Sequence, residues 1–247
     1  MRSSETSSIY ENPALRKAGD GLIRPGGLEL TQRAVALAAL RSGSLVLDIG
    51  CGTGAAMRYL TESCSFRAIG IDLSSVLLAE GHGKTPGLLF VRASEACLPF
   101  ADAIMDAVLA ECSLSPMENM EKVLDECSRV LKPEGLLLVH DVYMHTSHGG
   151  AEIQDLPVEC RLSGAISREE WIKKLEGRGF AVAFWEDHSQ ALKEFAARLI
   201  FSHGSLEPFL RRSPKTSCME QCRGIPHALS IESPGYFLAV VKKTCQE

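Results

Sequence analysis

The sequence predicts an α/β fold with a mainly parallel, doubly wound sheet, and three observations support this prediction. Apolar runs of strand length alternate along the chain with segments of helical periodicity, which is the pattern of repeated βαβ units. One apolar run ends in closely spaced glycines, as strands do where they turn into a helix beside a ligand. The chain has 247 residues, 45% of them hydrophobic, which is enough to bury the core of a single domain over residues 1–247.

The alternating pattern sets the expected order of the elements. Strands are expected near residues 45–49, 67–72, 87–92, 106–111, 136–141, 180–186 and 236–242. Helices are expected near residues 28–41, 53–62, 74–82, 117–131, 167–178 and 189–203. The best-marked helix start is Ser167, because Glu170 three residues later completes a capping-box signature.

The glycines that follow the first strand carry the clearest functional signal. Gly50, Gly52 and Gly54 lack the Cβ atoms that would keep a ligand away from the backbone, and Cys51 lies among them. The helix expected next directs its N-terminal amides at the same place. We therefore expect a cofactor site at this glycine turn.

Two carboxylates indicate which cofactor the turn holds. The glycines also satisfy a relaxed dinucleotide pattern, so an NAD-dependent oxidoreductase stays open on that evidence. Asp48 at the tip of the first strand would face a pyrophosphate unfavourably, whereas it suits the cationic amino group of S-adenosylmethionine (SAM). Alternatively, Asp48 has no role beyond accepting hydrogen bonds from backbone amides of the turn. Asp72 ends the second strand, about twenty residues beyond the turn, where a carboxylate accepts both ribose hydroxyls.

Several segments between residues 45 and 141 occur in the order found in class I SAM-dependent methyltransferases of the small-molecule type. Besides the glycine turn and Asp72, residues 91–100 end in Leu-Pro-Phe and resemble that family's adenine-contacting segment. Residues 106–112 resemble its fourth strand, and residues 129–135 resemble the turn into its fifth. The resemblance implies SAM as the cofactor. It also implies a Rossmann-like, seven-stranded sheet of order 3-2-1-4-5-7-6 with the seventh strand antiparallel.

The same resemblance locates the cofactor contacts. Ser94 stands where the family usually has an Asp, and a neutral hydroxyl accepts a hydrogen bond from adenine more weakly than a carboxylate would. The fourth strand of the family ends beside the methionine part of the cofactor. The residues implied are Asp48, Gly50, Cys51, Gly52, Gly54, Asp72, Leu73, Ser94, Glu95, Glu111 and Cys112.

The methyl acceptor is expected at the carboxyl edge of the sheet, beside the fifth strand. Methyl transfer from a sulfonium is an in-line displacement, so the protein supplies mainly alignment and a deprotonated nucleophile. The catalytic candidates are Tyr143, His145 and Cys160, although histidines in loops are often merely solvated. The fourth strand lacks the Asn/Asp-Pro-Pro-Tyr/Phe sequence that grips planar amino nitrogens in related enzymes. A small-molecule acceptor is therefore favoured over an adenine amino group or a glutamine amide.

Two alternatives stay open. Residues 160–165 are similar to the cysteine-glycine-alanine segment of arsenite methyltransferases, and Cys218 and Cys222, one helical turn apart, could share a ligand. Metalloid or thiol methylation is thus the alternative function, although the spacing to these later cysteines is not that of the arsenite enzymes. The long segment 189–235 before the last strand is an insertion that could bind a protein partner. The chain would then be a SAM-binding partner without independent catalysis.

Composition and charge exclude other classes. A net charge of −5 gives no overall footprint for nucleic acid, and no apolar run is long enough to cross a membrane. The first residues contain no signal-peptide core, which predicts a cytoplasmic protein. Its nine cysteines are then expected to be mostly reduced. No metal site is predicted from the sequence. Residues 1–27 resemble the N-terminal lids of the family, residues 28–145 form the expected cofactor-binding core, and residues 146–247 form the substrate-side part.

Overall fold

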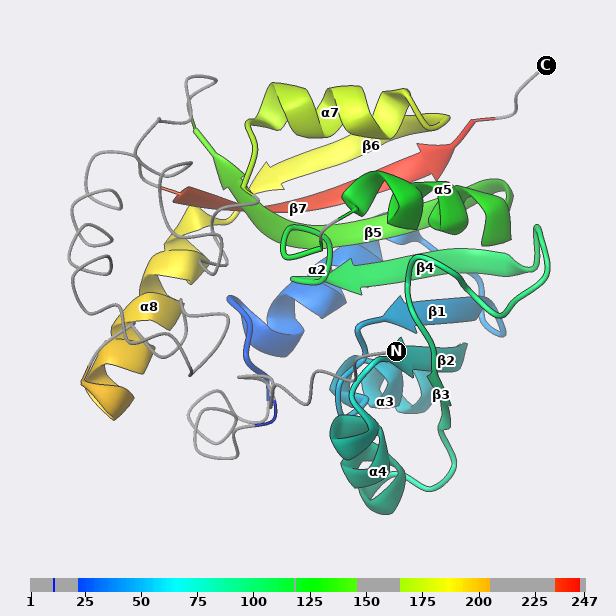
Figure 1. The fold of residues 1–247 in the computed structure, drawn as a ribbon, viewed down its shortest axis with the longest axis horizontal. Coiled ribbons are helices and arrows are strands. Elements are labelled where there is room, and N and C mark those ends of the chain that lie inside the picture. The colour runs from blue at the N-terminus through cyan, green and yellow to red at the C-terminus, as the bar shows by residue number, and fades with distance from the viewer. Residues whose placement is uncertain (1–10, 12–21, 118, 146–164, 205–233, 245–247) are drawn as a thin grey trace, which may run out of the picture.

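A seven-stranded sheet forms the middle layer of the protein in the computed structural model, which describes residues 11, 22–117, 119–145, 165–204 and 234–244 (Figure 1). The strands are β1 (Leu45–Ile49), β2 (Arg67–Asp72), β3 (Leu89–Arg92), β4 (Met105–Glu111), β5 (Leu131–Met144), β6 (Phe180–Asp187) and β7 (Pro234–Lys243). The described helices of eight or more residues are α2 (Gly27–Ala38), α3 (Ala55–Glu62), α4 (Ser75–Lys84), α5 (Met120–Val130), α7 (Arg168–Glu176) and α8 (Ser189–His203). None of the helices in the described part of the chain is long and apolar enough to span a membrane.

The strand order is β3-β2-β1-β4-β5-β7-β6, which confirms the order that the resemblance implied. Strands β1 to β5 pair in parallel, whereas β7 runs antiparallel to both β5 and β6. The chain moves from β1 outward to β3 and then returns to β4 on the other side of β1. This reversal puts the topological switch point at the carboxyl ends of β1 and β4, called here the β1–β4 crevice because doubly wound sheets bind their ligands in a crevice at this position.

Two apolar clusters, one on each face of the sheet, explain why the elements pack in this way. On one face, Ala34 of α2 and Met57 and Leu60 of α3 are buried against β1, β2 and β4. On the other face, α5 and α7 bury side chains such as Val123 and Trp171 against β4, β5 and β7. Strands covered on both faces have near-continuous apolar sequences, and for this reason all seven strands were predicted, although β5 begins five residues earlier and ends three residues later than expected.

Local caps set several element boundaries. Ser74 accepts a hydrogen bond from the Leu77 amide at 3.1 Å and so begins α4. The helix expected at 117–131 begins only at Met120, because the Asn119 side chain caps it by accepting from the Lys122 amide at 3.0 Å. The predicted capping box of Ser167 and Glu170 is confirmed at the start of α7.

The segment between β3 and β4 is the main departure from simple alternation. Residues 93–104 cross from one side of β1 to the other without forming a helix or a strand. Its backbone polar groups therefore need hydrogen-bond partners from outside the segment.

Candidate functional site

The glycine turn after β1 is open at one of its three glycines. Gly50, Gly52 and Gly54 all have positive φ, at 71°, 55° and 79°, so L-residues with side chains would be strained there. A Cβ on Gly50 would come within 3.0 Å of Ser113 Cβ, and one on Gly54 within 2.6 Å of Phe90 Cζ. A Cβ on Gly52 would meet nothing within 4 Å. Gly54 thus serves helix-strand packing, whereas Gly52 borders open space where a ligand fits.

Asp72 lies directly against this turn. Its Oδ2 accepts from the Gly52 amide at 2.9 Å, and its Oδ1 accepts from the Ser74 amide at 2.8 Å. A carboxylate has about four acceptor positions, so both oxygens keep capacity for the two hydroxyls of a ribose. The neighbouring Leu73 is 57% exposed, which leaves an apolar side chain free at the rim of the site.

Asp48 is a buried carboxylate at the tip of β1, only 3% exposed. Burial raises its pKa well above the usual range, the nearby Glu111 and Asp72 carboxylates raise the pKa further, and Arg24 opposes them. Among the described residues, no group donates a hydrogen bond to the Asp48 side chain. A buried acid flanked by other acids is stabilised by an incoming cation, so the residues at the β1–β4 crevice fit the ammonium of a SAM molecule.

Glu111 ends β4 inside a buried polar cluster. Its Oε1 accepts from Thr31 Oγ1 at 2.7 Å and lies 3.2 Å from His140 Nδ1, and its Oε2 is ion-paired with Arg24. Arg24 also donates to Thr31 Oγ1 at 2.7 Å. Burial raises the pKa of Glu111, but the Arg24 and His140 side chains outweigh it and hold the pKa below its usual range.

This arrangement places Glu111 against the protein's own cation rather than free for a cofactor. The sequence interpretation named Glu111 but missed Arg24 and Thr31 as its partners. The sequence signal was weak, because Arg24 is one of three arginines before α2. Glu11, also from the N-terminal segment, accepts from Ser74 Oγ at 2.6 Å, so described residues of this segment reach both sides of the turn.

The two cysteines assigned to the cofactor site are neutral thiols. Burial raises the pKa of Cys51, and the neighbouring Asp48 and Asp72 raise it further. Burial likewise raises the pKa of Cys112, whose Sγ lies 3.0 Å from the Tyr236 hydroxyl. Neither is a nucleophile in this state, because the thiolate is the reactive form. The Cys51 side chain packs in the apolar cluster on one face of the sheet, where its Sγ would lie 2.6 Å from a Cβ on Gly70.

Ser94 and Glu95 follow β3 at the same edge. Ser94 Oγ accepts from the Ala96 amide at 3.3 Å, which folds the start of the segment into a turn. Glu95 is 8% exposed; burial raises its pKa, and the nearby Asp72 raises it further. Both residues therefore lie on the Asp72 side of the glycine turn, where the adenine of a nucleoside bound by Asp72 would extend.

A second polar cluster forms at the carboxyl end of β5. Tyr143 donates to Asp187 at the end of β6, and its hydroxyl lies 3.1 Å from His145 Nδ1. Ser189, the first residue of α8, donates to Asp187 Oδ2 at 2.7 Å and lies 3.3 Å from His145 Nε2. Burial, followed by the Asp187 contact, raises the pKa of Tyr143 to about 12. The tyrosine is therefore a neutral hydrogen-bond donor.

The structure brings the two predicted residues Tyr143 and His145 together and adds two that the sequence did not indicate. Asp187 and Ser189 each lie 44 residues beyond their partners Tyr143 and His145. They meet these partners because β5 and β6 both run antiparallel to β7, which brings the carboxyl ends of β5 and β6 to the same edge of the sheet. The third catalytic candidate, Cys160, lies outside the described residues, as do Cys218 and Cys222.

The strand order, the antiparallel β7 and the glycine turn with its two acids define the fold of class I SAM-dependent methyltransferases. Among solved structures, the protein is similar to the [4+2]-cyclase SpnF, with a TM-score of 0.75 and 25% identity over 96% of this chain and 94% of that one. It also matches Haemonchus contortus phosphoethanolamine N-methyltransferase 2 in complex with phosphomonomethylethanolamine and S-adenosylhomocysteine (SAH). That match has a TM-score of 0.69 and 18% identity, and it covers 94% of this chain and 56% of the other.

Sequence comparisons agree with this fold over part of the chain. Residues 47–139 match the family model described as a methyltransferase domain. A curated relative is the phosphoethanolamine N-methyltransferase of Triticum aestivum, which is 26% identical over 200 residues, 79% of this chain and 36% of the relative. A protein of Haemophilus influenzae is 33% identical over 138 residues, 53% of this chain and 55% of that protein. The chain thus spans about a third to about a half of the length of these curated relatives.

Proposed function

We propose that this protein binds SAM and transfers its methyl group to a small-molecule acceptor. The observation that carries the proposal is the pair of acids at the glycine turn, with Asp72 beside Gly52 and the buried Asp48 at the β1–β4 crevice. These two acids suit the two polar ends of one SAM molecule. The methyltransferase family model over residues 47–139 supports the same interpretation.

Each part of the cofactor has a matching part of the site. Asp72 would accept the ribose hydroxyls, Asp48 would pair with the ammonium, and the exposed Leu73 with the Ser94–Glu95 turn would contact the adenine. When bound, SAM supplies an electrophilic methyl group on a sulfonium. The protein then needs only to align an acceptor and to remove its proton where the acceptor carries one.

The cluster at the end of β5 is suited to that second task. Tyr143 donates its only hydroxyl proton to Asp187. The hydrogen bond between the Tyr143 oxygen and His145 therefore requires that Nδ1 of His145 carries the hydrogen. This tautomer leaves Nε2 of His145 with a lone pair. Ser189 Oγ lies 3.3 Å from Nε2, but its proton is donated to Asp187, so the lone pair keeps its capacity to accept. His145 is exposed, so an acceptor hydroxyl or amine could donate a hydrogen bond to Nε2 and give its proton to that nitrogen.

The direct test is calorimetric titration with SAM and SAH, followed by incubation with isotopically methyl-labelled SAM and a metabolite extract. We expect both ligands to bind and label to appear in a small molecule. Binding without transfer to any acceptor would favour a role as a non-catalytic partner or, as in the similar cyclase, a different reaction on the same fold. Preferential binding of NADH, followed by its near-ultraviolet absorbance, would contradict the proposal.

Protonation of Asp48 gives this proposal a pH-dependent signature. The free protein has a raised Asp48 pKa, and an ammonium placed beside the carboxylate would lower it. SAM binding should therefore release a proton at pH values below the raised pKa, and SAM affinity should increase as pH rises. Calorimetry in two buffers of different ionisation enthalpy, repeated at several pH values below about 7, where an α-amino group is protonated, measures this release. Asp48→Asn should bind more weakly and show no difference between the buffers, whereas equal heats in both buffers at every pH for wild type would contradict the role.

Two variants discriminate between the acceptor-side hypotheses. If Tyr143 and His145 act on the acceptor, Tyr143→Phe should reduce turnover by about a hundredfold, in the range for loss of general acid-base assistance, while SAM affinity is kept. Cys160→Ser should then change turnover little. If the alternative of metalloid or thiol methylation holds, Cys160→Ser should abolish transfer to arsenite or a thiol, and wild type should bind arsenite through Cys160 and Cys218 or Cys222. We expect the first outcome.

A protein partner is proposed on narrower grounds. Helix α8, which begins the segment 189–235, exposes Ile200 at 47% and Phe201 at 94%. Adjacent exposed apolar side chains on one helix are a typical feature of binding surfaces. If transfer appears only after a second protein is added, Phe201→Ser should abolish this activation by the second protein without changing SAM affinity.

A further inference from the structure

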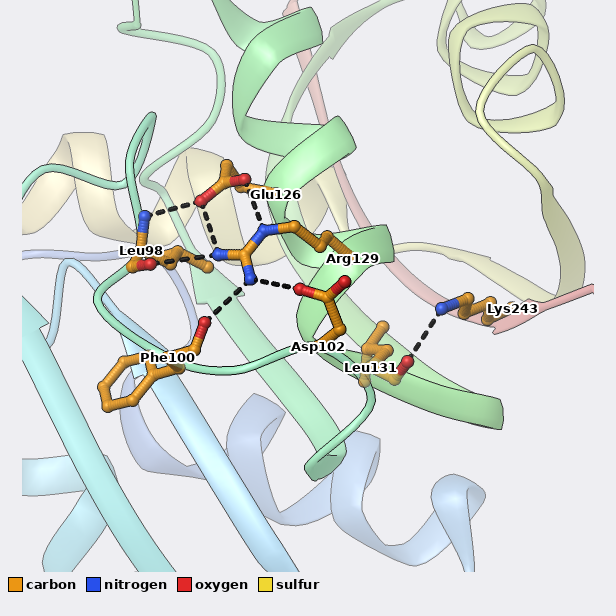
Figure 2. Close-up of polar contacts among 7 residues, drawn as sticks. All are labelled: Leu98, Phe100, Asp102, Glu126, Arg129, Leu131 and Lys243. Atoms are coloured by element: carbon orange, nitrogen blue, oxygen red, sulfur yellow. Dashed lines mark hydrogen bonds and ion pairs between the residues drawn. The ribbon is translucent and has the colours of Figure 1, made fainter.

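Residues 94–100 are an irregular segment whose main chain is held by side chains from another element. The segment lies between β3 and β4, and it has no strand neighbour to satisfy its amides and carbonyls. Its start is at the cofactor side of the sheet, because Glu95 lies close enough to Asp72 for the two charges to influence each other. Its end, residues Leu98 to Phe100, runs alongside helix α5 (Figure 2).

Glu126 and Arg129 of α5 bind three backbone groups of this segment. Arg129 donates from Nη2 to the Leu98 carbonyl at 3.0 Å and from Nη1 to the Phe100 carbonyl at 2.7 Å. Glu126 Oε2 accepts from the Leu98 amide at 2.6 Å. Figure 2 shows the guanidinium in the middle of these contacts, between the helix and the segment.

The two side chains also fix each other. Arg129 Nε lies 2.7 Å from Glu126 Oε1, and Nη2 lies 2.8 Å from Glu126 Oε2, which makes the pair bidentate. The two contacts with Glu126 direct the remaining donors of the planar guanidinium at the two carbonyls, a geometry that a lysine could not reproduce. Asp102 adds an ion pair at 2.7 Å, but its side chain is 76% exposed and contributes little.

The polar contacts supplement an apolar anchor beneath the segment. Leu98 is 4% exposed in the cluster that includes Cys127 and Val130 of α5. Apolar burial is non-directional, so it holds the segment down without setting the path of its main chain. The hydrogen bonds from α5 are directional, and they define where the backbone runs from Phe100 back to Ser94.

We propose that Glu126 and Arg129 are positioning residues that hold residues 94–100 in the shape that contacts the adenine of the cofactor. This inference rests on the proposed function, since it assigns the Ser94–Glu95 turn to the adenine side. Neither residue touches the cofactor in this assignment. They act through the backbone of Leu98 and Phe100, a few residues after the Ser94–Glu95 turn that is assigned to the adenine.

The test compares SAH affinity in Arg129→Met, Arg129→Lys and Glu126→Gln with wild type by calorimetry. Arg129→Met should weaken SAH binding by about tenfold, the effect of losing hydrogen bonds to a charged donor that position a binding segment. 5′-Methylthioadenosine, which shares the adenosine part, should lose affinity in the same proportion. Once a methyl acceptor is identified, Arg129→Met should raise KM for SAM while kcat at saturating SAM is unchanged. Hydrogen exchange of the Leu98 amide should become faster in the same variant.

Arg178→Met is a matched control. Arg178 also pairs with a glutamate of α5, Glu121, at 2.7 Å, but it joins the end of α7 to the helix and contacts nothing in residues 94–100. It should leave SAH affinity unchanged. Equal loss in the Arg129 and Arg178 variants, or wild-type affinity in both Arg129→Met and Glu126→Gln, would overturn the inference.

The remaining outcomes are also decisive. If Arg129→Met does not fold, Glu126→Gln still tests the inference. This substitution removes the negative charge of the pair but keeps the size and shape of the Glu126 side chain. If wild type binds neither SAM nor SAH, the proposed function fails and this inference falls with it. If wild type binds and the Arg129 and Glu126 variants bind equally well, only the inference fails.

Discussion

Replacing Arg24 with alanine is expected to lower the free energy of unfolding by about 3–5 kcal/mol, the cost of leaving one partner of a buried ion pair uncompensated. The Glu111 side chain is 2% exposed and the Arg24 side chain 11%, so water cannot replace the lost guanidinium without rearrangement. Thr31 would lose a donor at the same time. Urea unfolding of wild type and variant at neutral pH measures the difference.

The pH dependence of this effect has a definite sign. In wild type the folded-state pKa of Glu111 is below its usual value, so its favourable contribution is present above the unfolded pKa and is lost as pH falls through the folded pKa. Without Arg24 the charged form loses its main partner, and the deficit of the variant should therefore be largest near neutral pH and shrink in acid.

Arg33→Ala is the control for a surface ion pair. Arg33 binds Glu186 at 2.5 Å, but the arginine side chain is 50% exposed, so its loss should cost less than about 1 kcal/mol. If Arg24→Ala destabilises the protein no more than Arg33→Ala does, the buried cluster around Glu111 is not a stabilising feature.

Asp72→Ala is expected to weaken SAM binding by about 1.5–3 kcal/mol, the range for hydrogen bonds to a charged group. The structure gives a second reason for a large effect, because the same carboxylate holds the Gly52 and Ser74 amides at 2.9 and 2.8 Å. The variant thus loses both an acceptor for the ribose and the support of the turn that faces the cofactor. Calorimetry with SAM measures the change.

Two comparisons make this prediction specific. Ser94→Ala should cost less, because its acceptor is neutral and already receives the Ala96 amide at 3.3 Å. Asp125→Ala, at an acid of α5 that is 63% exposed, should leave the dissociation constant unchanged. An Asp72 variant that binds SAM as tightly as the Asp125 variant would remove Asp72 from the cofactor site.

Features that depend on neighbours in sequence were predictable. The strands of the sheet, the capping box at Ser167 and the three left-handed glycines of the turn each follow from a local pattern of residues. The positions of Asp48 and Asp72 were also predictable, because the carboxyl ends of parallel strands lie along one edge of a sheet wherever the strands are ordered.

Contacts between distant segments were not predictable in this way. Glu111 and Thr31 are 80 residues apart, Arg129 reaches Leu98 across 31, and Ser189 meets His145 across 44. No periodicity or spacing encodes such pairs. They arise only once the strand order and register bring particular side chains to the same place.

By itself, then, the sequence determined the class of fold, the glycine turn and the acids beside it, since short-range backbone preferences and strand alternation suffice for these. The tertiary structure alone decided that Glu111 is paired with Arg24, that Asp187 and Ser189 join Tyr143 and His145, and that Arg129 supports the segment after β3. The physical reason is that burial and ion pairing depend on the three-dimensional environment of a side chain. That environment is created by packing between elements that lie far apart along the chain.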